Sequence, residues 1–157
     1  MSCVYRALPR IIPNRLLSAK KSTSVAIVSP WIQDVELQVP ILDGYYRRDS
    51  RKMYFSYLLN YLVEKRQQRI YLFIRDNDER AKYATRIIRK NNQASLEIFI
   101  VQHLHAKAIL TNSNILLTSA NLIFTSLYRN VESCSLQINP YQNTIKYVEY
   151  EFGVRLT

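Results

Sequence analysis

The chain has 157 residues, the size of one ordinary domain with a single sizeable core. Hydrophobic residues make up 48% of it, which excludes a disordered chain, and only two glycines occur, Gly44 and Gly153, which excludes a glycine-rich phosphate loop. Lysine and arginine total 22 against 12 acidic residues, and the formal charge of +10 indicates a polyanionic partner, either nucleic acid or an anionic membrane.

The amino-terminal segment is basic. Residues 1–33 contain no acidic residue but carry Arg6, Arg10, Arg15, Lys20 and Lys21, while Pro9 and Pro13 interrupt any long helix. The sequence predicts a partly ordered basic arm over residues 1–22, in front of a catalytic domain over residues 23–157. Such an arm can bind nucleic acid, or it can be an organelle-targeting segment, which is also arginine-rich and acid-poor.

A buried strand is predicted over residues 24–31 (SVAIVSPW), ending at Pro30, because proline cannot donate to a strand ladder. Trp31 follows at the carboxyl end of that strand, where it reads most simply as a ring that fills the core or a dimer interface. Residues 34–49 are predicted to be a loop with Tyr45, Tyr46, Arg47 and Arg48. Tyrosine rings beside arginines can stack on bases while the cations hold the backbone, so Arg47 and Arg48 are candidate nucleic-acid contacts.

Two helices and a strand are predicted in the middle of the chain. Residues 50–67 form an amphipathic helix, with apolar side chains at helical spacing: Phe55, Leu58, Leu59 and Leu62. Residues 69–75 form the next strand, and the spacing of Asp76 and Glu79 predicts a capping box that starts a helix running to about residue 91. One side of this helix is basic, through Arg80, Lys82, Arg86, Arg89 and Lys90. Such a side is usually only solvated, but it also makes Arg86, Arg89 and Lys90 candidate nucleic-acid contacts.

Strands dominate the rest of the chain. The expected strands are residues 95–101, 103–111, 115–118 and 132–138, with a hairpin turn at 112–114. A short helix is expected over residues 122–128, and a closing helix from Pro140 to about Glu151. Strands that alternate with helices predict an α/β domain.

Reactive side chains concentrate in residues 102–132. His105 and Lys107 are two residues apart on a predicted strand, so their side chains are expected to share one face. Ser119 and Asn121 lie at the predicted start of the short helix, a favourable place for an anion, and Glu132 follows. An imidazole, an ammonium, a hydroxyl, an amide and a carboxylate together have the composition of a phosphate-handling site.

This arrangement resembles a known signature. His105-x-Lys107, then Asn112, then Ser119-x-Asn121, is similar to the HxK(x4)D…GSxN motif of the phospholipase D superfamily. With the later Glu132, the local spacing is most similar to the small single-motif nucleases of that superfamily. The resemblance implies a single phospholipase D-like domain with a mixed central β-sheet flanked by helices.

The motif departs from the family pattern at two positions. Asn112 stands where the family has an aspartate, and Thr118 stands where it has the glycine of GS. The gap between these two residues is also one residue shorter than usual. Asn112 is expected to be a turn residue, while Thr118 is expected to crowd a tight turn beside the phosphate.

The chemistry of phosphodiester cleavage assigns a role to each residue. His105 can attack phosphorus as a neutral imidazole and form a phosphohistidine, and Lys107 can neutralise the developing charge. Ser119 and Asn121 can donate hydrogen bonds to phosphate oxygens, while Glu132 can hold the imidazole in the right tautomer. The resemblance implies the same roles. We therefore predict a phosphodiesterase, an endonuclease that cleaves DNA or RNA without a metal or cofactor.

A homodimer is predicted from the number of histidines. The family mechanism uses two, one as nucleophile and one as acid, each from its own motif. This chain has only His103 and His105, and His103 has no lysine two residues later. A second motif must come from another chain, so the two His105 residues are expected to face each other across a two-fold axis. A His-x-His metal pair is conceivable, but no third ligand is evident.

Two other functions stay open. The departures at Asn112 and Thr118 favour a catalytically inactive nucleic-acid-binding protein of the same fold. A lipid phosphodiesterase is a further alternative, although no amphipathic membrane helix stands out. No apolar run approaches the roughly 20 residues of a membrane-spanning helix, so stable membrane insertion is not expected. Cys3 and Cys134 are too far apart in sequence for a disulfide framework, which is typical of a reducing, cytoplasmic setting.

Overall fold

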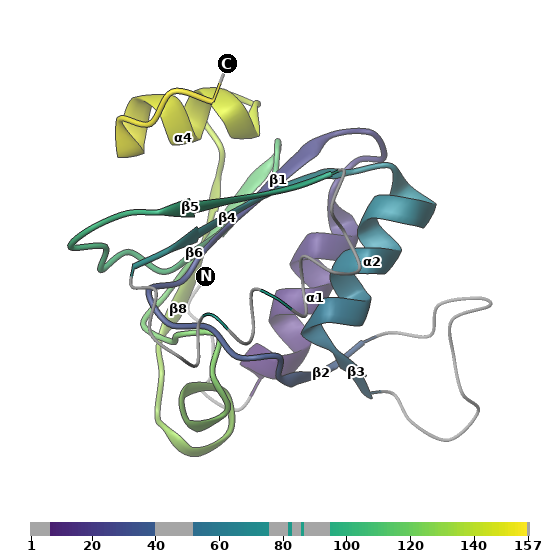
Figure 1. Cartoon of the computed structure of the whole chain (residues 1–157), viewed down its shortest axis with the longest axis vertical. Coiled ribbons are helices and arrows are strands. Elements are labelled where there is room, and N and C mark those ends of the chain that lie inside the picture. Colours follow the sequence, from purple (N-terminus) through teal and green to yellow (C-terminus); the bar gives the residue numbers. More distant parts are fainter. Residues whose placement is uncertain (1–6, 40–51, 76–81, 83–85, 87–94, 157) are drawn as a thin grey trace.

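The computed structural model describes residues 7–39, 52–75, 82, 86 and 95–156 (Figure 1). Its strands are β1 (Ser24–Val28), β2 (Glu36–Gln38), β3 (Lys52–Tyr54), β4 (Arg69–Ile74), β5 (Leu96–Ile100), β6 (Ala108–Leu110), β7 (Asn114–Thr118) and β8 (Cys134–Ile138). Its helices are α1 (Leu8–Ser18), α2 (Phe55–Arg66) and α4 (Thr144–Phe152), with a π-helix, η1 (Thr125–Arg129). Most of the predicted helix at 76–91 lies outside the described residues.

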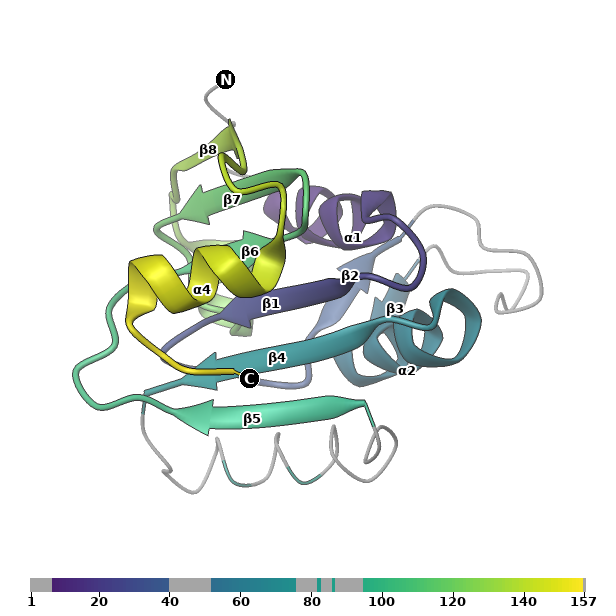
Figure 2. The ribbon, with the colours of Figure 1, turned by 90° about the horizontal axis from the view of Figure 1, so that it is seen from above.

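Six strands form the central sheet in the order β5-β4-β1-β6-β7-β8 (Figure 2). The pairs β1–β4 and β4–β5 are parallel, whereas β1–β6, β6–β7 and β7–β8 are antiparallel, so the sheet is mixed. α1 and α2 pack on one face and α4 on the other (Figure 1). This arrangement confirms the predicted α/β domain with a mixed central sheet flanked by helices.

The sequence of β1 explains why both faces of the sheet are covered. Val25 and Ile27 belong to the core shared with α1 and α2, whereas Ala26 and Val28 belong to the core under α4. A strand that is apolar in both directions is buried only when other elements pack on both of its faces. Thr144 attaches α4 to this strand, because its hydroxyl donates a hydrogen bond to the Ser24 carbonyl at 2.7 Å.

The segment predicted to be an arm is part of the core. Residues 8–18 form α1, and Leu8, Ile12 and Leu16, four residues apart, are buried in the same cluster as the apolar face of α2. Pro9 lies in the first turn, where a helix needs no backbone donor. Pro13 lies inside the helix and forgoes one hydrogen bond, which burial of the apolar face offsets. Residue 22 is therefore not a structural boundary.

The other predicted helices are present with shifted starts. The helix expected over 50–67 begins at Phe55, because Lys52–Tyr54 pair with β2 instead. The closing helix begins at Thr144 rather than Pro140. Asn143 caps it, since its side-chain oxygen accepts a hydrogen bond from the Lys146 N–H at 3.0 Å.

Cys134, buried at the start of β8, is disulfide-bonded. This differs from the sequence expectation, because separation along the chain says little about proximity in the fold. The other cysteine of the sequence, Cys3, lies outside the described residues.

Candidate active site

Strand register brings the predicted site residues to one edge of the sheet. Val28 at the end of β1 pairs with Ala108 at the start of β6, and Ala108 also pairs with Leu117 near the end of β7. Thr118, the last residue of β7, pairs with Cys134, the first of β8. The segments that carry His105 and Lys107, Ser119 and Asn121, and Glu132 therefore adjoin the same edge.

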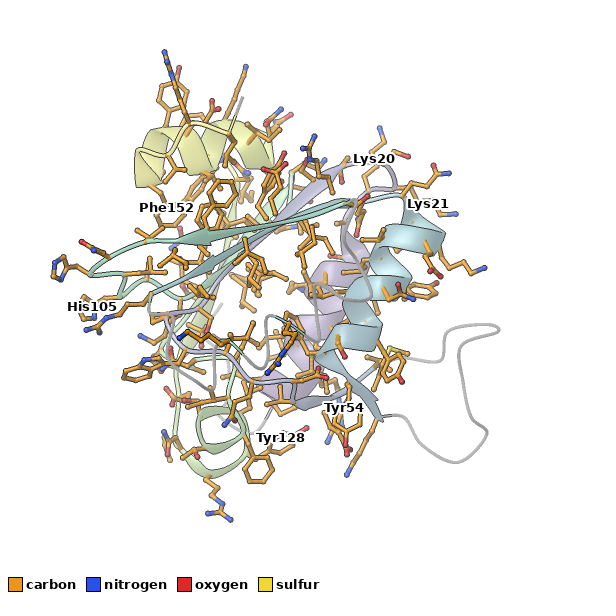
Figure 3. The ribbon with its side chains drawn as sticks, in the orientation of Figure 1. Lys20, Lys21, Tyr54, His105, Tyr128 and Phe152 are labelled. Carbon is orange, nitrogen blue, oxygen red and sulfur yellow. The ribbon has the colours of Figure 1, made fainter. Side chains whose placement is uncertain are left out.

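His105 and Lys107 do not lie on a strand, so the predicted strand over 103–111 is too long. β6 begins only at Ala108, and His103 has a left-handed backbone with φ of 60°. The Leu104 N–H donates to the Val101 carbonyl at 3.3 Å, so a turn interrupts the extended backbone before Leu104 packs in the core under α4. The Lys107 ammonium instead donates to the His105 carbonyl at 2.9 Å. The His105 side chain is exposed at this edge, at the opposite end of the molecule from Lys20 and Lys21 (Figure 3).

Ser119 and Glu132 are in direct contact. The Ser119 hydroxyl donates a hydrogen bond to the Glu132 carboxylate and accepts one from the Ser133 N–H at 2.9 Å. The Asn130 amide donates to the other oxygen of Glu132 at 3.2 Å. Within the described part of the chain, the His105 side chain makes no hydrogen bond, so its predicted contact with Glu132 is not present in this conformation.

Thr118 holds the turn that it was expected to crowd. Its hydroxyl donates to the Ser133 carbonyl at 3.0 Å and accepts a hydrogen bond from the Ala120 N–H at 3.0 Å. This second bond is a local side-chain-to-backbone turn of the kind that serine and threonine favour. The backbone at Thr118 is not left-handed, so this turn needs no glycine there, and the threonine hydroxyl stabilises it.

Asn121 lies in a buried loop rather than at the start of a helix. The helix expected over 122–128 is present as the π-helix η1, which begins only at Thr125. Leu122 instead bridges Ile32 in parallel, and its N–H donates to the Ser29 hydroxyl at 2.9 Å. Asn121 is 8% exposed, and its side-chain oxygen has no hydrogen-bond partner among the described residues.

Asn112 is remote from these groups. It lies in the turn between β6 and β7, at the end of that hairpin opposite Lys107 and Thr118. Its buried side-chain oxygen also has no partner within the described ranges. The residue at the family's aspartate position is thus a turn residue here, as the sequence predicted.

The sequence placed Trp31 at the carboxyl end of β1, but it gave no role to Ser29 in the same segment. Ser29 is buried and joins this segment to Leu122 through its hydroxyl. Arg75, directly after β4, reaches the same edge, since its N–H donates to the Pro30 carbonyl at 3.0 Å. A serine–proline pair directly after a continuous apolar strand was the available signal.

Of the five predicted nucleic-acid contacts, one lies among the described residues. Arg86 is helical and exposed, while Arg47, Arg48, Arg89 and Lys90 lie outside the described residues. In the part of the chain that is described, no three His, Cys, Asp or Glu side chains gather as a metal site would need. Over the same residues, no helix has both the length and the apolar character needed to cross a membrane.

The fold is that of phospholipase D-like proteins. Nuc from Salmonella typhimurium, a phospholipase D family member, is 14% identical with a TM-score of 0.62, over 91% of this chain and 83% of Nuc. NucT from Helicobacter pylori is 14% identical with a TM-score of 0.61, over 98% of this chain and 92% of NucT. The predicted resemblance to the phospholipase D superfamily is thus confirmed at the level of the fold.

A DNA-binding protein shares part of this architecture. TrmBL2, an archaeal chromatin protein described as showing a novel mode of DNA binding, is 10% identical with a TM-score of 0.54. The match covers 98% of this chain and 49% of TrmBL2. No protein-family model matches the sequence, and no curated protein matches it.

Proposed function

We propose that this protein is a phosphodiesterase that cleaves DNA or RNA, without a metal, through a phosphohistidine intermediate. The observation that carries the proposal is the meeting of the His105–Lys107 segment with the Ser119–Asn121 turn and Glu132 at one edge of a phospholipase D-like sheet. The formal charge of +10 favours a nucleic acid as the polyanionic substrate.

His105 is the nucleophile in this proposal. Its exposed imidazole attacks phosphorus, a P–N bond forms, and the bond from phosphorus to the leaving oxygen breaks. A proton passes to that oxygen from an acid, and water then attacks phosphorus and releases the histidine. Lys107, held beside His105 by its bond to the His105 carbonyl, offsets the charge on the phosphoryl oxygens.

Asn121 and Ser119 orient the phosphate. The Asn121 side chain makes no hydrogen bond within the described residues, so its amide is free to bind a phosphate oxygen. Ser119 donates its one hydroxyl proton to Glu132 in this conformation, so it donates to a phosphate oxygen only once that hydroxyl turns away from the carboxylate. A fixed donor such as the Asn121 amide stabilises charge without reorganisation during the reaction.

The acid comes from a second copy of the chain. Only His103 and His105 are available as histidines, and His103 lies in a turn with left-handed backbone two residues before the nucleophile. A two-fold dimer that places the two His105 side chains on opposite sides of one phosphate supplies nucleophile and acid together.

The test is cleavage of labelled single- and double-stranded DNA and RNA in excess chelator. Wild type is expected to cut under these conditions, His105→Asn to be inactive, and His103→Asn to retain most activity. Cutting that chelator abolishes would contradict the metal-free mechanism. For the dimer, sedimentation is expected to give a two-chain species, and a fully active monomer would overturn the shared site.

A second candidate is an inactive nucleic-acid-binding protein. The DNA-binding description of TrmBL2 and the departures at Asn112 and Thr118 favour it. It predicts equal retention of labelled DNA by wild type and His105→Asn, with no cutting by either protein. Turnover of phospholipid in liposomes, without any cutting of nucleic acid, would instead favour a lipid phosphodiesterase.

A further inference from the structure

Trp31 is held in place but exposed. Its indole is 45% exposed, while its neighbours Pro30 and Ile32 are buried. The Ser29 hydroxyl donates to the Trp31 carbonyl at 2.6 Å, and the Gln33 N–H donates to the Leu122 carbonyl at 2.8 Å. The backbone on both sides of Trp31 is therefore held by hydrogen bonds while the Trp31 side chain faces solvent.

A second exposed ring comes from the neighbouring segment. Phe124 is 48% exposed, and its N–H donates to the Gln33 side chain at 2.8 Å, which ties it to the loop of Trp31. Its ring stacks on Tyr128 with centroids 5.1 Å apart, and the Arg129 guanidinium lies 5.5 Å from its centroid. An aromatic stack and a cation thus stand together on this segment.

Both segments adjoin the candidate active site. Ile32 bridges Leu122, which directly follows Asn121. On the other side, Val28 at the end of β1 pairs with Ala108, which directly follows Lys107. The loop of Trp31 therefore runs between the two segments that carry the proposed phosphate ligands.

We propose that Trp31, together with the Phe124–Arg129 pair, is a stacking platform for the unpaired bases of a single-stranded nucleic acid. This rests on the proposed function, because the backbone phosphate of the same strand would lie at Lys107 and Asn121. Aromatic faces stack on any base, and arginine adds charge and a planar surface. Bases inside a duplex are already stacked, so the platform selects single strands.

The chain offers a direct probe, because Trp31 is its only tryptophan. His105→Asn protein, which binds without cutting, is titrated with a single-stranded oligonucleotide, with a duplex, and with an abasic strand of the same length. Tryptophan emission is expected to be quenched by the base-bearing single strand, and much less by the abasic strand or the duplex. Equal quenching by the abasic strand overturns the platform, since only phosphates would then be recognised.

Substitutions test whether the Trp31 ring itself contributes to the binding of a single strand. Trp31→Ala is expected to weaken binding of a labelled single strand by about tenfold, and Trp31→Phe to retain most of the affinity. Tyr57, which is 57% exposed on α2, provides the matched control, and Tyr57→Ala is expected to bind as wild type. Unchanged binding by Trp31→Ala contradicts the proposal.

Two further outcomes are distinguishable. Tryptophan emission could change with protein concentration but not on addition of the oligonucleotide. That result would mean that a second copy of the chain covers Trp31, and it would overturn the proposal. If quenching depends on the bases but wild type cuts no nucleic acid, the stacking platform is supported. In that case the proposed phosphodiesterase activity fails, and the protein is a single-strand binder.

Discussion

The hydroxyl of Ser119 donates a hydrogen bond to the carboxylate of Glu132, which joins the turn after β7 to the segment before β8. Asn130 holds the other carboxylate oxygen. Two polar side chains, Ser119 and Asn130, thus orient Glu132 before any substrate binds. A carboxylate fixed in this way can meet an imidazole without rearranging, once substrate or a partner chain moves the His105 side chain.

Ser119→Ala is expected to lower the cleavage rate about tenfold or more, because Glu132 loses one of its two partners. Unfolding free energy is expected to fall by about 1 kcal/mol, the usual net value of one such bond. Rates and denaturant melts check both effects. Ser119→Thr keeps a hydroxyl and is expected to recover most of the rate; a Thr variant as slow as the Ala variant would contradict this role.

Lys107→Met is expected to reduce cleavage by about 10²–10³-fold, because a fixed cation beside the phosphoryl group is lost. Its bond to the His105 carbonyl is lost as well, so Lys107→Arg is the informative partner variant. The arginine variant should keep part of the activity. Lys20→Met, at the far end of the sheet, is the charge-matched control (Figure 3). Equal losses in the Lys20 and Lys107 variants would show that only net charge matters.

Asn121→Leu is expected to leave the free energy of unfolding unchanged or slightly raised while cleavage falls. The buried oxygen of Asn121 has no partner among the described residues, and removing an unpaired buried acceptor relieves its desolvation cost. Thermal melts and cleavage rates of the same preparation check the two effects. A large loss of stability would mean that the amide is structural.

Asn139 is the matched control for Asn121. It is also buried, but its amide donates to the Thr111 carbonyl at 3.0 Å and its oxygen accepts from the Tyr141 N–H at 3.0 Å. Its amide also donates to the Asn143 carbonyl at 3.3 Å. Asn139→Leu is therefore expected to cost about 1–3 kcal/mol, because it leaves these three backbone groups without their partner.

Leu16→Ala is expected to lower the free energy of unfolding by about 2–5 kcal/mol, because Leu16 is fully buried in the core beside α2. Removal of residues 1–22 is expected to unfold the protein rather than only weaken nucleic-acid binding. Arg10→Gln, at an exposed position of α1, should change stability by less than about 0.5 kcal/mol. A stable, folded truncation would restore the idea of a dispensable arm.

Tyr128 links stability to alkaline pH. Partial burial, and then the nearby Glu36 carboxylate, raise the pKa of Tyr128 above its ordinary value, and its hydroxyl donates to the Glu36 carbonyl. A raised pKa stabilises the protein below the unfolded value of about 10, and this contribution is lost as pH rises through the folded pKa. Wild type should therefore lose stability more steeply than Tyr128→Phe above about pH 10. Denaturant melts of both proteins over a range of pH check this. A stability difference between wild type and Tyr128→Phe that stays the same above about pH 10 would contradict it.

The sequence predicted the features that depend on local pattern. Continuous apolar runs gave the strands of the central sheet, and the order His105, Lys107, Ser119, Asn121 indicated the phospholipase D-like fold. The hairpin predicted at 112–114 is present, but none of its residues adopts left-handed backbone, and the Asn114 N–H instead donates to the Thr111 hydroxyl at 3.0 Å. Each of these signals lies within a few residues of the feature that it predicts.

The features that were missed depend on tertiary packing. His105 and Lys107 lie outside the strand because a turn at His103 ends the extended backbone, and helix α1 persists despite Pro13 because its leucines meet α2. The pairing of Ile32 with Leu122 replaces the first turn of the expected helix. These contacts produce no local hydrophobic pattern in the sequence, because the residues that make them lie in distant segments.

The position of β1 in the sheet also affects folding during synthesis. This early strand needs both β4 and β6 as neighbours, and it needs α4, the last helix, to cover one face. A chain still emerging from the ribosome therefore presents an apolar strand with open edges until β4, β6 and α4 have all been made. Such non-local pairing slows folding and exposes the nascent chain to aggregation. Disruption of α4 should accordingly reduce soluble yield far more than it alters the chemistry of the finished site.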